Sequence, residues 1–134
     1  MSDDSIPLAQ LRDAMPFAAL ISVELLEAKP ALVRARLAWT PEHCTAAGVM
    51  HGGALMALAD TCGGVCAFLN LPGGASATAT VESHTHFLRA VRDGAIIATT
   101  RPLHRARTLI VLETEIARED GALVAKVTQT QIFK

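Results

Sequence analysis

Aromatic and basic residues are both sparse in this chain of 134 residues. There is no tyrosine, and four phenylalanines and one tryptophan make up all the large aromatic rings, so platforms for stacking nucleic-acid bases are not expected. The 12 lysines and arginines are scattered and are balanced by 13 acidic residues, which gives a net charge of −1. Without a basic patch, nucleic acid is not an expected partner.

Cysteines and uninterrupted apolar runs are also scarce. The three cysteines are an odd number, and the first residues, Met1–Asp4, are acidic and lack the basic start of a secretory signal. These features predict a protein of the reducing cytoplasm. The longest apolar stretch, about residues 44–81, is interrupted by Asp60, Pro72 and several glycines, so no membrane span is predicted.

The chain is nevertheless rich in small and aliphatic apolar residues. Hydrophobic residues make up 51%, charged residues only 19%, and the mean hydropathy is +0.34. This length and composition predict one domain over residues 1–134 with a substantial core. Some of the apolar excess is expected to cover a subunit interface.

The hydrophobic pattern predicts an α+β protein. A short helix is expected at about residues 5–15, ended by Pro16, before a core of about residues 20–134. A loop is expected at 40–50 and one long helix at 52–69. Strands are expected at 20–28, 31–39, 77–89, 94–103, 107–117 and 122–133.

Alternation along the strands indicates how they pack. In the second strand one face is apolar (Val33, Ala35, Leu37), and in the fifth one face carries Ile110, Leu112 and Ile116. The last three strands follow one another at hairpin spacing, which predicts an antiparallel sheet. The 52–69 helix is apolar nearly all round, which is typical of a buried helix. An antiparallel sheet wrapped around that helix is the economical arrangement.

Two glycines stand inside the long helix. Gly63 and Gly64 each cost roughly 1 kcal/mol relative to alanine in a helix interior. We therefore expect a close approach of another group at this point.

Asp60 is the only formally charged residue between residues 44 and 81. A carboxylate in so apolar a segment is a candidate functional group, although it could also simply reach solvent or cap a neighbouring element. His51 precedes it by nine residues, which places the two about 180° apart around a helix and about 13 Å apart along it. They cannot meet in one chain with a continuous helix, but they can meet across a two-fold axis between two chains.

The His51-Gly52-Gly53 start of the helix complements this carboxylate. Glycines let a ligand approach the backbone, and the free N–H groups of Gly52 and Gly53 suit an oxyanion or a polarised carbonyl. A carboxylate opposite such a helix end is suited to acyl transfer to water, with the acid acting as nucleophile or as general base.

At these residues the chain resembles the hotdog-fold acyl-CoA thioesterases of the phenylacetate-degradation type. The likeness extends over roughly residues 17–134. The segments that carry it are Gly48-Val49-Met50-His51-Gly52-Gly53, Leu58-Ala59-Asp60-Thr61, Thr80-Val81-Glu82, Phe87-Leu88-Arg89, Leu103-His104-Arg105-Ala106-Arg107 and Asp120-Gly121-Ala122-Leu123-Val124-Ala125.

The resemblance implies a hotdog fold and a metal-independent hydrolysis of an acyl- or aryl-acyl-CoA, with no cofactor besides the CoA of the substrate. Asp60 would be the catalytic carboxylate, and the Gly52 N–H would polarise the thioester carbonyl. His51 would hold that loop and contact the thioester region, and Gly53 and Gly64 would contact the substrate. Thr80 stands where the family often has a serine or threonine near the attacking water.

The resemblance also implies substrate contacts and an assembly. Arg89, Arg105 and Arg107 lie on segments that commonly contact the phosphates and adenosine of CoA. The family pairs subunits through their sheets, as homodimers or homotetramers with sites shared between subunits. No membrane or nucleic-acid partner is implied.

Three positions depart from the family pattern. Thr45 stands where an asparagine or glutamine usually contacts the substrate or water, and a hydroxyl reaches less far than an amide. Gly64, four residues after the acid, replaces a polar residue of some aryl-CoA members, and Ala106 replaces a usual glycine. Two rival readings stay open: a hydratase or dehydratase on the same fold, and a non-catalytic acyl-CoA-binding protein.

A metal site is not expected. Cys62 and Cys66 are four residues apart on the predicted helix and are most simply small core residues. With His84 and His86 they could suggest zinc, but no close Cys-x-x-Cys pair is present.

Overall fold

The computed structural model describes residues 6–134. The predicted helix start at Ser5 therefore lies outside the described residues. Two short helices, α1 (Leu8–Asp13) and α2 (Pro16–Leu20), take the place of the single helix predicted over 5–15. Pro16 cannot continue α1, but its fixed φ suits the first turn of a new helix. The first strand consequently begins later than residue 20.

Within residues 6–134 the strands form one six-stranded antiparallel sheet in the order β1-β2-β4-β5-β6-β3. All six strands lie where the sequence predicts them, with shifts of a few residues at their ends. Their bounds are β1 Glu24–Lys29, β2 Leu32–Ala38, β3 Thr78–Phe87, β4 Ala95–Arg105, β5 Leu109–Arg118 and β6 Leu123–Phe133.

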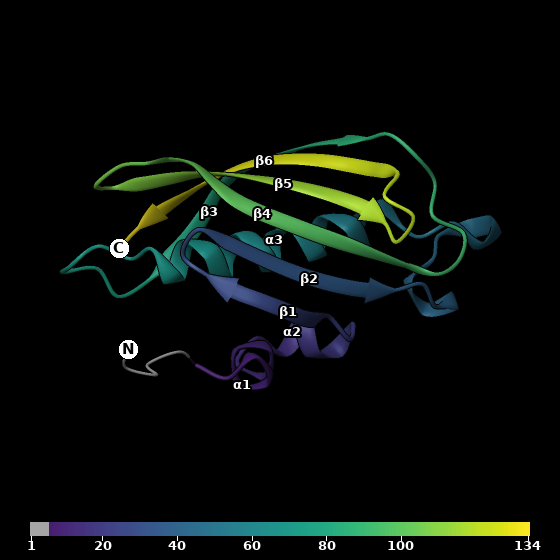
Figure 1. Cartoon of the computed structure of the whole chain (residues 1–134), viewed down its shortest axis with the longest axis horizontal. Coiled ribbons are helices and arrows are strands. Elements are labelled where there is room, and N and C mark those ends of the chain that lie inside the picture. Colours follow the sequence, from purple (N-terminus) through teal and green to yellow (C-terminus); the bar gives the residue numbers. More distant parts are fainter. Residues whose placement is uncertain (1–5) are drawn as a thin grey trace.

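The long helix α3 (Gly52–Leu69) has the bounds predicted for it, and the sheet curves around it (Figure 1). The predicted inward faces are confirmed, because Val33, Ala35 and Leu37 of β2 and Ile110, Leu112 and Ile116 of β5 are fully buried. They pack with the buried side of α3 in one core. This is the hotdog fold. By length and composition α3 could cross a membrane, but here it is the core helix of this sheet.

The predicted burial of α3 in the core is confirmed, but one of its faces is exposed. Gly53, Met56, Asp60 and Phe68 are exposed, at spacings of three, four and eight residues that place them on one side of the helix. Hydropathy does not distinguish this face from the buried one, because most of its residues are apolar or small. The exposed side chains include Met56 at 41% and Phe68 at 43%.

Strand β3 is an edge of the sheet, and it is largely exposed. Its partner on one side is β6, and no described strand pairs with its other side. Val81 and Phe87 are 55% and 53% exposed, and Leu88, which follows the strand, is 52% exposed. A long edge strand bearing apolar residues is a ready surface for another chain.

The two glycines inside α3 have different surroundings. At Gly63 an added Cβ would overlap the side-chain amide of Gln129 on β6, so the predicted close approach is confirmed there. At Gly64 the nearest heavy atom to an added Cβ is Gln131 Nε2 at 3.9 Å, which is an ordinary contact. Only Gly63 is required by packing.

We predict opposite effects of alanine at these two sites. Gly63→Ala should lower the free energy of unfolding by about 2 kcal/mol, because overpacking outweighs the gain in helix propensity. Gly64→Ala, the matched control, should leave stability unchanged or raise it by up to about 1 kcal/mol. Urea unfolding followed by circular dichroism measures both. Equal stabilities of the two variants would contradict the close packing of Gly63 against Gln129.

Candidate active site

The segment before α3 is held by backbone hydrogen bonds. It contains two short 3₁₀ turns, η1 (Pro41–His43) and η2 (Ala46–Gly48), in the region predicted as a loop. The Met50 N–H donates to Val91 O at 2.8 Å, and the His51 N–H donates to His43 O at 2.8 Å. These bonds fix the backbone that enters α3.

His51 caps the start of α3. Its Nδ1 accepts a hydrogen bond from the Gly53 N–H at 2.7 Å, as the side chain of an N-cap residue does. Within residues 6–134 the Gly52 N–H donates to no group. Gly52 therefore offers a free N–H at the positive end of an 18-residue helix.

Asp60 lies on the exposed face of α3, eight residues after Gly52. Its Oδ1 accepts a hydrogen bond of 2.9 Å from the Thr80 hydroxyl on β3. The carboxylate opens on a pocket of about 390 Å³. This carboxylate pocket is lined by Met15, Phe17, Ala18, Ala57, Asp60, Thr61, Gly64, Thr78, Ala79, Thr80 and Gln131.

Gly52 lines a different pocket, of about 430 Å³. Thr45 and Arg89 line it as well, together with Phe87, whose ring lies against Gly52. We call this the glycine pocket. Thr45 thus lies beside the candidate oxyanion donor, at the position where the family resemblance places an amide.

A single chain keeps the two chemical groups apart. Because α3 is one continuous helix, Gly52 and Asp60 are about 12 Å apart along its axis. His51 and Gly53 line a third pocket, which shares Phe17 and Ala57 with the carboxylate pocket. Among the predicted site residues, Thr80 and Gly64 therefore line the same pocket as Asp60. Thr45 and Arg89 line the same pocket as Gly52.

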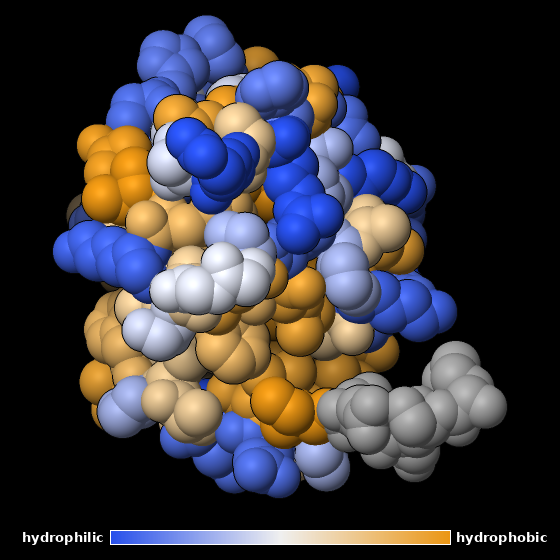
Figure 2. Space-filling model, turned by 90° about the vertical axis from the view of Figure 1, so that its left-hand side faces the viewer, coloured by the Kyte–Doolittle hydropathy of each residue, from blue (hydrophilic) through white to orange (hydrophobic). Residues whose placement is uncertain are grey.

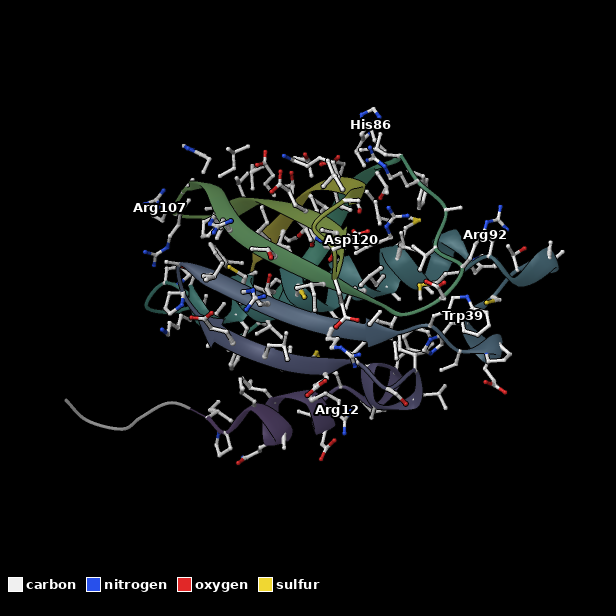
Figure 3. All side chains as sticks on the ribbon, turned by 45° about the vertical axis from the view of Figure 1, so that its right-hand side comes forward. Arg12, Trp39, His86, Arg92, Arg107 and Asp120 are labelled. Carbon is white, nitrogen blue, oxygen red and sulfur yellow. The ribbon has the colours of Figure 1, made fainter. Side chains whose placement is uncertain are left out.

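The three candidate CoA arginines lie at separate places. Arg89 Nη1 donates to Leu123 O at 2.6 Å beside the glycine pocket. Arg105 Nη2 donates to Asn70 O at 3.1 Å, at the other end of α3. Arg107 lies in the turn between β4 and β5, at the opposite end of the molecule from Arg92 (Figure 3).

A sequence profile described as "Thioesterase superfamily" matches residues 47–125, the segment that holds His51, Gly52, Asp60 and Thr80. The chain belongs to the thioesterase superfamily.

Relatives of this thioesterase-superfamily protein cover most of its length. A Deinococcus radiodurans protein named "Putative esterase" is 34% identical over 115 residues, which are 84% of this chain and 75% of the relative. "Putative esterase Rv1847" of Mycobacterium tuberculosis is 29% identical over 120 residues, which are 88% of this chain and 86% of the relative.

Solved structures share the fold. The structure of Rv1847 matches with a TM-score of 0.86 and 26% identity, covering 90% of this chain and 97% of that chain. Thioesterase PA1618 of Pseudomonas aeruginosa gives 0.90 at 21% identity, covering 98% and 96%. Phenylacetic acid degradation protein PaaI of Thermus thermophilus gives 0.80 at 23% identity, covering 87% and 97%. The hotdog fold predicted from the sequence is confirmed.

Sequence reasoning about this superfamily member missed two polar residues near Asp60. Gln129 and Gln131 on β6 are 0% and 2% exposed, and Gln131 lines the carboxylate pocket. They continue the inward alternation of Ala125 and Val127. Because these two amides follow apolar residues on the same strand face, the sequence could have predicted a buried polar network there.

The cysteines and histidines do not gather. All three cysteines are free, and no group of three or more metal-ligating side chains occurs within residues 6–134. His84 and His86 form only a pair, with their Nε2 atoms 3.1 Å apart on exposed β3. Burial raises the pKa of the Cys62 thiol to about 12 and that of Cys66 to about 11.

We predict that the thiols of the native protein react unequally. The thiolate is the reactive form, so at pH 8 the raised pKa values and burial should protect Cys62 and Cys66. Titration with Ellman's reagent should detect one thiol per chain, the half-buried Cys44, and all three only after unfolding in urea. Cys44→Ser should remove the native signal. Rapid native labelling of that variant would contradict the burial of the other two.

Proposed function

We propose that this protein is an acyl-CoA thioesterase of the phenylacetate-degradation type, which converts an acyl- or aryl-acyl-CoA and water into the free acid and CoA. One observation carries the proposal. Asp60, the lone acid of the core helix, is held by Thr80 on the exposed face of α3 and opens on a pocket. The thiols are free, which supports action in the reducing cytoplasm.

The proposed site is shared between two chains. The exposed face of α3 and the edge of β3 form one open side of the molecule, with Met56, Phe68, Val81 and Phe87 exposed on it. A second copy related by a two-fold axis would run its α3 antiparallel to this one, bringing Gly52 of one chain toward Asp60 of the other. A homodimer, or a homotetramer of two such dimers, completes the site.

The chemistry follows from these two groups. The Gly52 N–H donates to the thioester oxygen, with His51 fixing the turn by accepting from Gly53. Asp60 either takes a proton from the attacking water or attacks the carbonyl itself. In the first route the water oxygen bonds to the carbonyl carbon, the C–S bond breaks, and the CoA sulfur receives the proton. In the second, an Asp60 oxygen bonds to the carbonyl carbon and the C–S bond breaks, so that CoA leaves as the thiolate. Water then cleaves the resulting anhydride into the free acid and the Asp60 carboxyl group, whose proton passes to the thiolate.

The arginines are proposed as contacts for the phosphates of CoA. Arg89 is suited to this because it lies in the glycine pocket. Arg105 and Arg107 lie near the C-terminal end of α3, far from the glycine pocket at its start. They can contact the same substrate as Arg89 only if they come from the second subunit. The two-fold axis that pairs Gly52 with Asp60 also brings opposite ends of the two chains together.

The acyl group is proposed to occupy an apolar groove between α1 and α3. The groove is about 380 Å³ and is lined by Ile6, Gln10, Leu11, Ala14, Met15, Gly64, Val65 and Phe68. Met15 and Gly64 also line the carboxylate pocket, so the two spaces adjoin. Figure 2, which faces one end of the molecule, shows apolar surface gathered in the lower half, where the N-terminal helices lie in Figure 1. An apolar acyl or aryl group suits such a lining.

We predict that Asp60→Asn lowers kcat by at least about 100-fold, because it removes a positioned base or nucleophile. A thiol-release assay over aliphatic and aryl acyl-CoA substrates measures it. Glu82→Gln is a matched control, since Glu82 also accepts a threonine hydroxyl bond, from Thr130 at 3.0 Å, but on the outer face of the sheet. It should keep wild-type kcat.

Three outcomes of that assay would contradict the assignment. Wild-type turnover by folded Asp60→Asn would remove Asp60 from the mechanism. No thiol release from any substrate by the wild-type protein would favour a binding protein, in which Thr45 replaces the usual amide. Loss of an enoyl absorbance without thiol release would favour a hydratase.

We predict that two inactive variants complement each other. His51→Ala and Asp60→Asn chains, unfolded and refolded together, should recover activity, because half of the dimers are mixed and each mixed dimer has one unmutated site. Random pairing gives about one quarter of the wild-type sites. Each variant refolded alone is the control. Native mass spectrometry that shows mixed dimers without activity would contradict a shared site.

A further inference from the structure

Two fully buried glutamines lie directly behind the candidate carboxylate. Gln129 and Gln131 of β6 are 0% and 2% exposed, and both point toward α3. A buried amide without partners destabilises a fold, whereas leucine or methionine would fill the same space without that cost. The bonds that these amides make therefore indicate what they do.

The amide of Gln131 is bonded on both sides. Its Oε1 accepts from the Thr78 hydroxyl at 2.7 Å. Its Nε2 donates to Thr80 Oγ1 at 2.8 Å and to Gln129 Oε1 at 2.8 Å. Three partners that agree on donor and acceptor fix the orientation of this amide.

The Thr80 hydroxyl has one proton to give. Because its oxygen accepts from Gln131, the proton is directed to Asp60 Oδ1, at 2.9 Å. The second oxygen of Asp60 has no partner within residues 6–134. With Oδ1 held by Thr80, Oδ2 is the oxygen that can accept a proton from water or attack the thioester carbon.

Gln129 anchors the chain of bonds to the helix. Its Nε2 donates to the carbonyl of Ala59, the residue before Asp60, at 3.3 Å. Gln129 reaches that carbonyl because Gly63 has no side chain to block it. The close packing at Gly63 thus serves the carboxylate as well as the fold.

We propose that Gln131, supported by Gln129, is a positioning residue for thioester hydrolysis that acts through Thr80 on Asp60. The proposal rests on the function proposed above. Gln131 sets the direction of the Thr80 proton and so holds the Asp60 carboxylate in its reactive orientation. The hydrogen bonds in this network depend on one another, so a change at Gln131 alters the orientation of Asp60.

The test is Gln131→Met, which keeps an unbranched chain of similar size and removes the amide. It should lower kcat about tenfold and leave KM within about twofold, because ground-state binding of the substrate does not use this amide. Thr114→Val is the matched structural control. It removes a buried hydroxyl bonded to Thr100 at 2.6 Å, outside this chain of bonds, and should lower Tm without lowering kcat.

A double-mutant cycle separates positioning from loss of fold. Thr80→Val alone should lower kcat, and in that background Gln131→Met should cost nothing further, because it acts only through Thr80. If Gln131→Met does not fold, Thr78→Val loosens the same amide from the half-buried side and should lower kcat about threefold.

Two results distinguish this inference from the proposed function. Wild-type turnover combined with unchanged kcat in folded Gln131→Met, or multiplicative effects in the cycle, overturns the positioning role alone. Absence of turnover by the wild-type protein on all acyl-CoA substrates overturns both.

Discussion

The packing of α3 against the concave side of the sheet is the interaction on which the rest of the structure depends. It buries Leu55, Leu58 and Cys62 against fully buried side chains of β2, β4 and β5. The sheet covers one face of α3 and the N-terminal helices lie against part of the rest, but Gly53, Met56 and Asp60 stay exposed. Asp60 lies on this exposed face, so the fold itself delivers a carboxylate to a surface next to β3.

The same packing separates the two chemical groups of the site. A continuous helix carries its free N–H groups at its start and Asp60 more than two turns later, and no rearrangement of side chains can bring them together. Asp60 and Gly52 therefore line two separate pockets of one chain, which the proposed function treats as two halves of a shared site. In the proposed dimer, a second copy completes them through the exposed face of α3 and the apolar edge of β3.

Two of the buried polar side chains, Gln129 and Gln131, lie behind the carboxylate. Gln129, Gln131 and Thr80 link β6 and β3 to α3 by hydrogen bonds whose directions are fixed from Thr78 to Asp60. Such a network is costly to bury and stable only when it is fully satisfied. Its place next to Asp60 supports a role in orienting that group, in addition to holding the sheet to the helix.

The sequence by itself determined the elements and the candidate chemistry. Alternation in β2 and β5 is a local period of two residues, and α3 is a continuous apolar run of helix length, so both are local patterns of the sequence. Asp60 and His51-Gly52-Gly53 were identifiable because they are exceptional in an apolar segment. The break of the N-terminal helix at Pro16 was visible, but the start of a second helix there was not, since proline permits both.

Only the tertiary structure decided which groups meet. The pairing of β3 with β6 joins segments about 50 residues apart, and it places Thr80 on Asp60 and Gln131 behind both. The tertiary structure also leaves one face of the apolar helix α3 exposed. It places Arg105 against Asn70 O, whereas Arg89 lies against Leu123 O. Local periodicity carries no information about such long-range pairing, because the register of an edge strand is set by the hydrogen bonds and packing of the whole sheet.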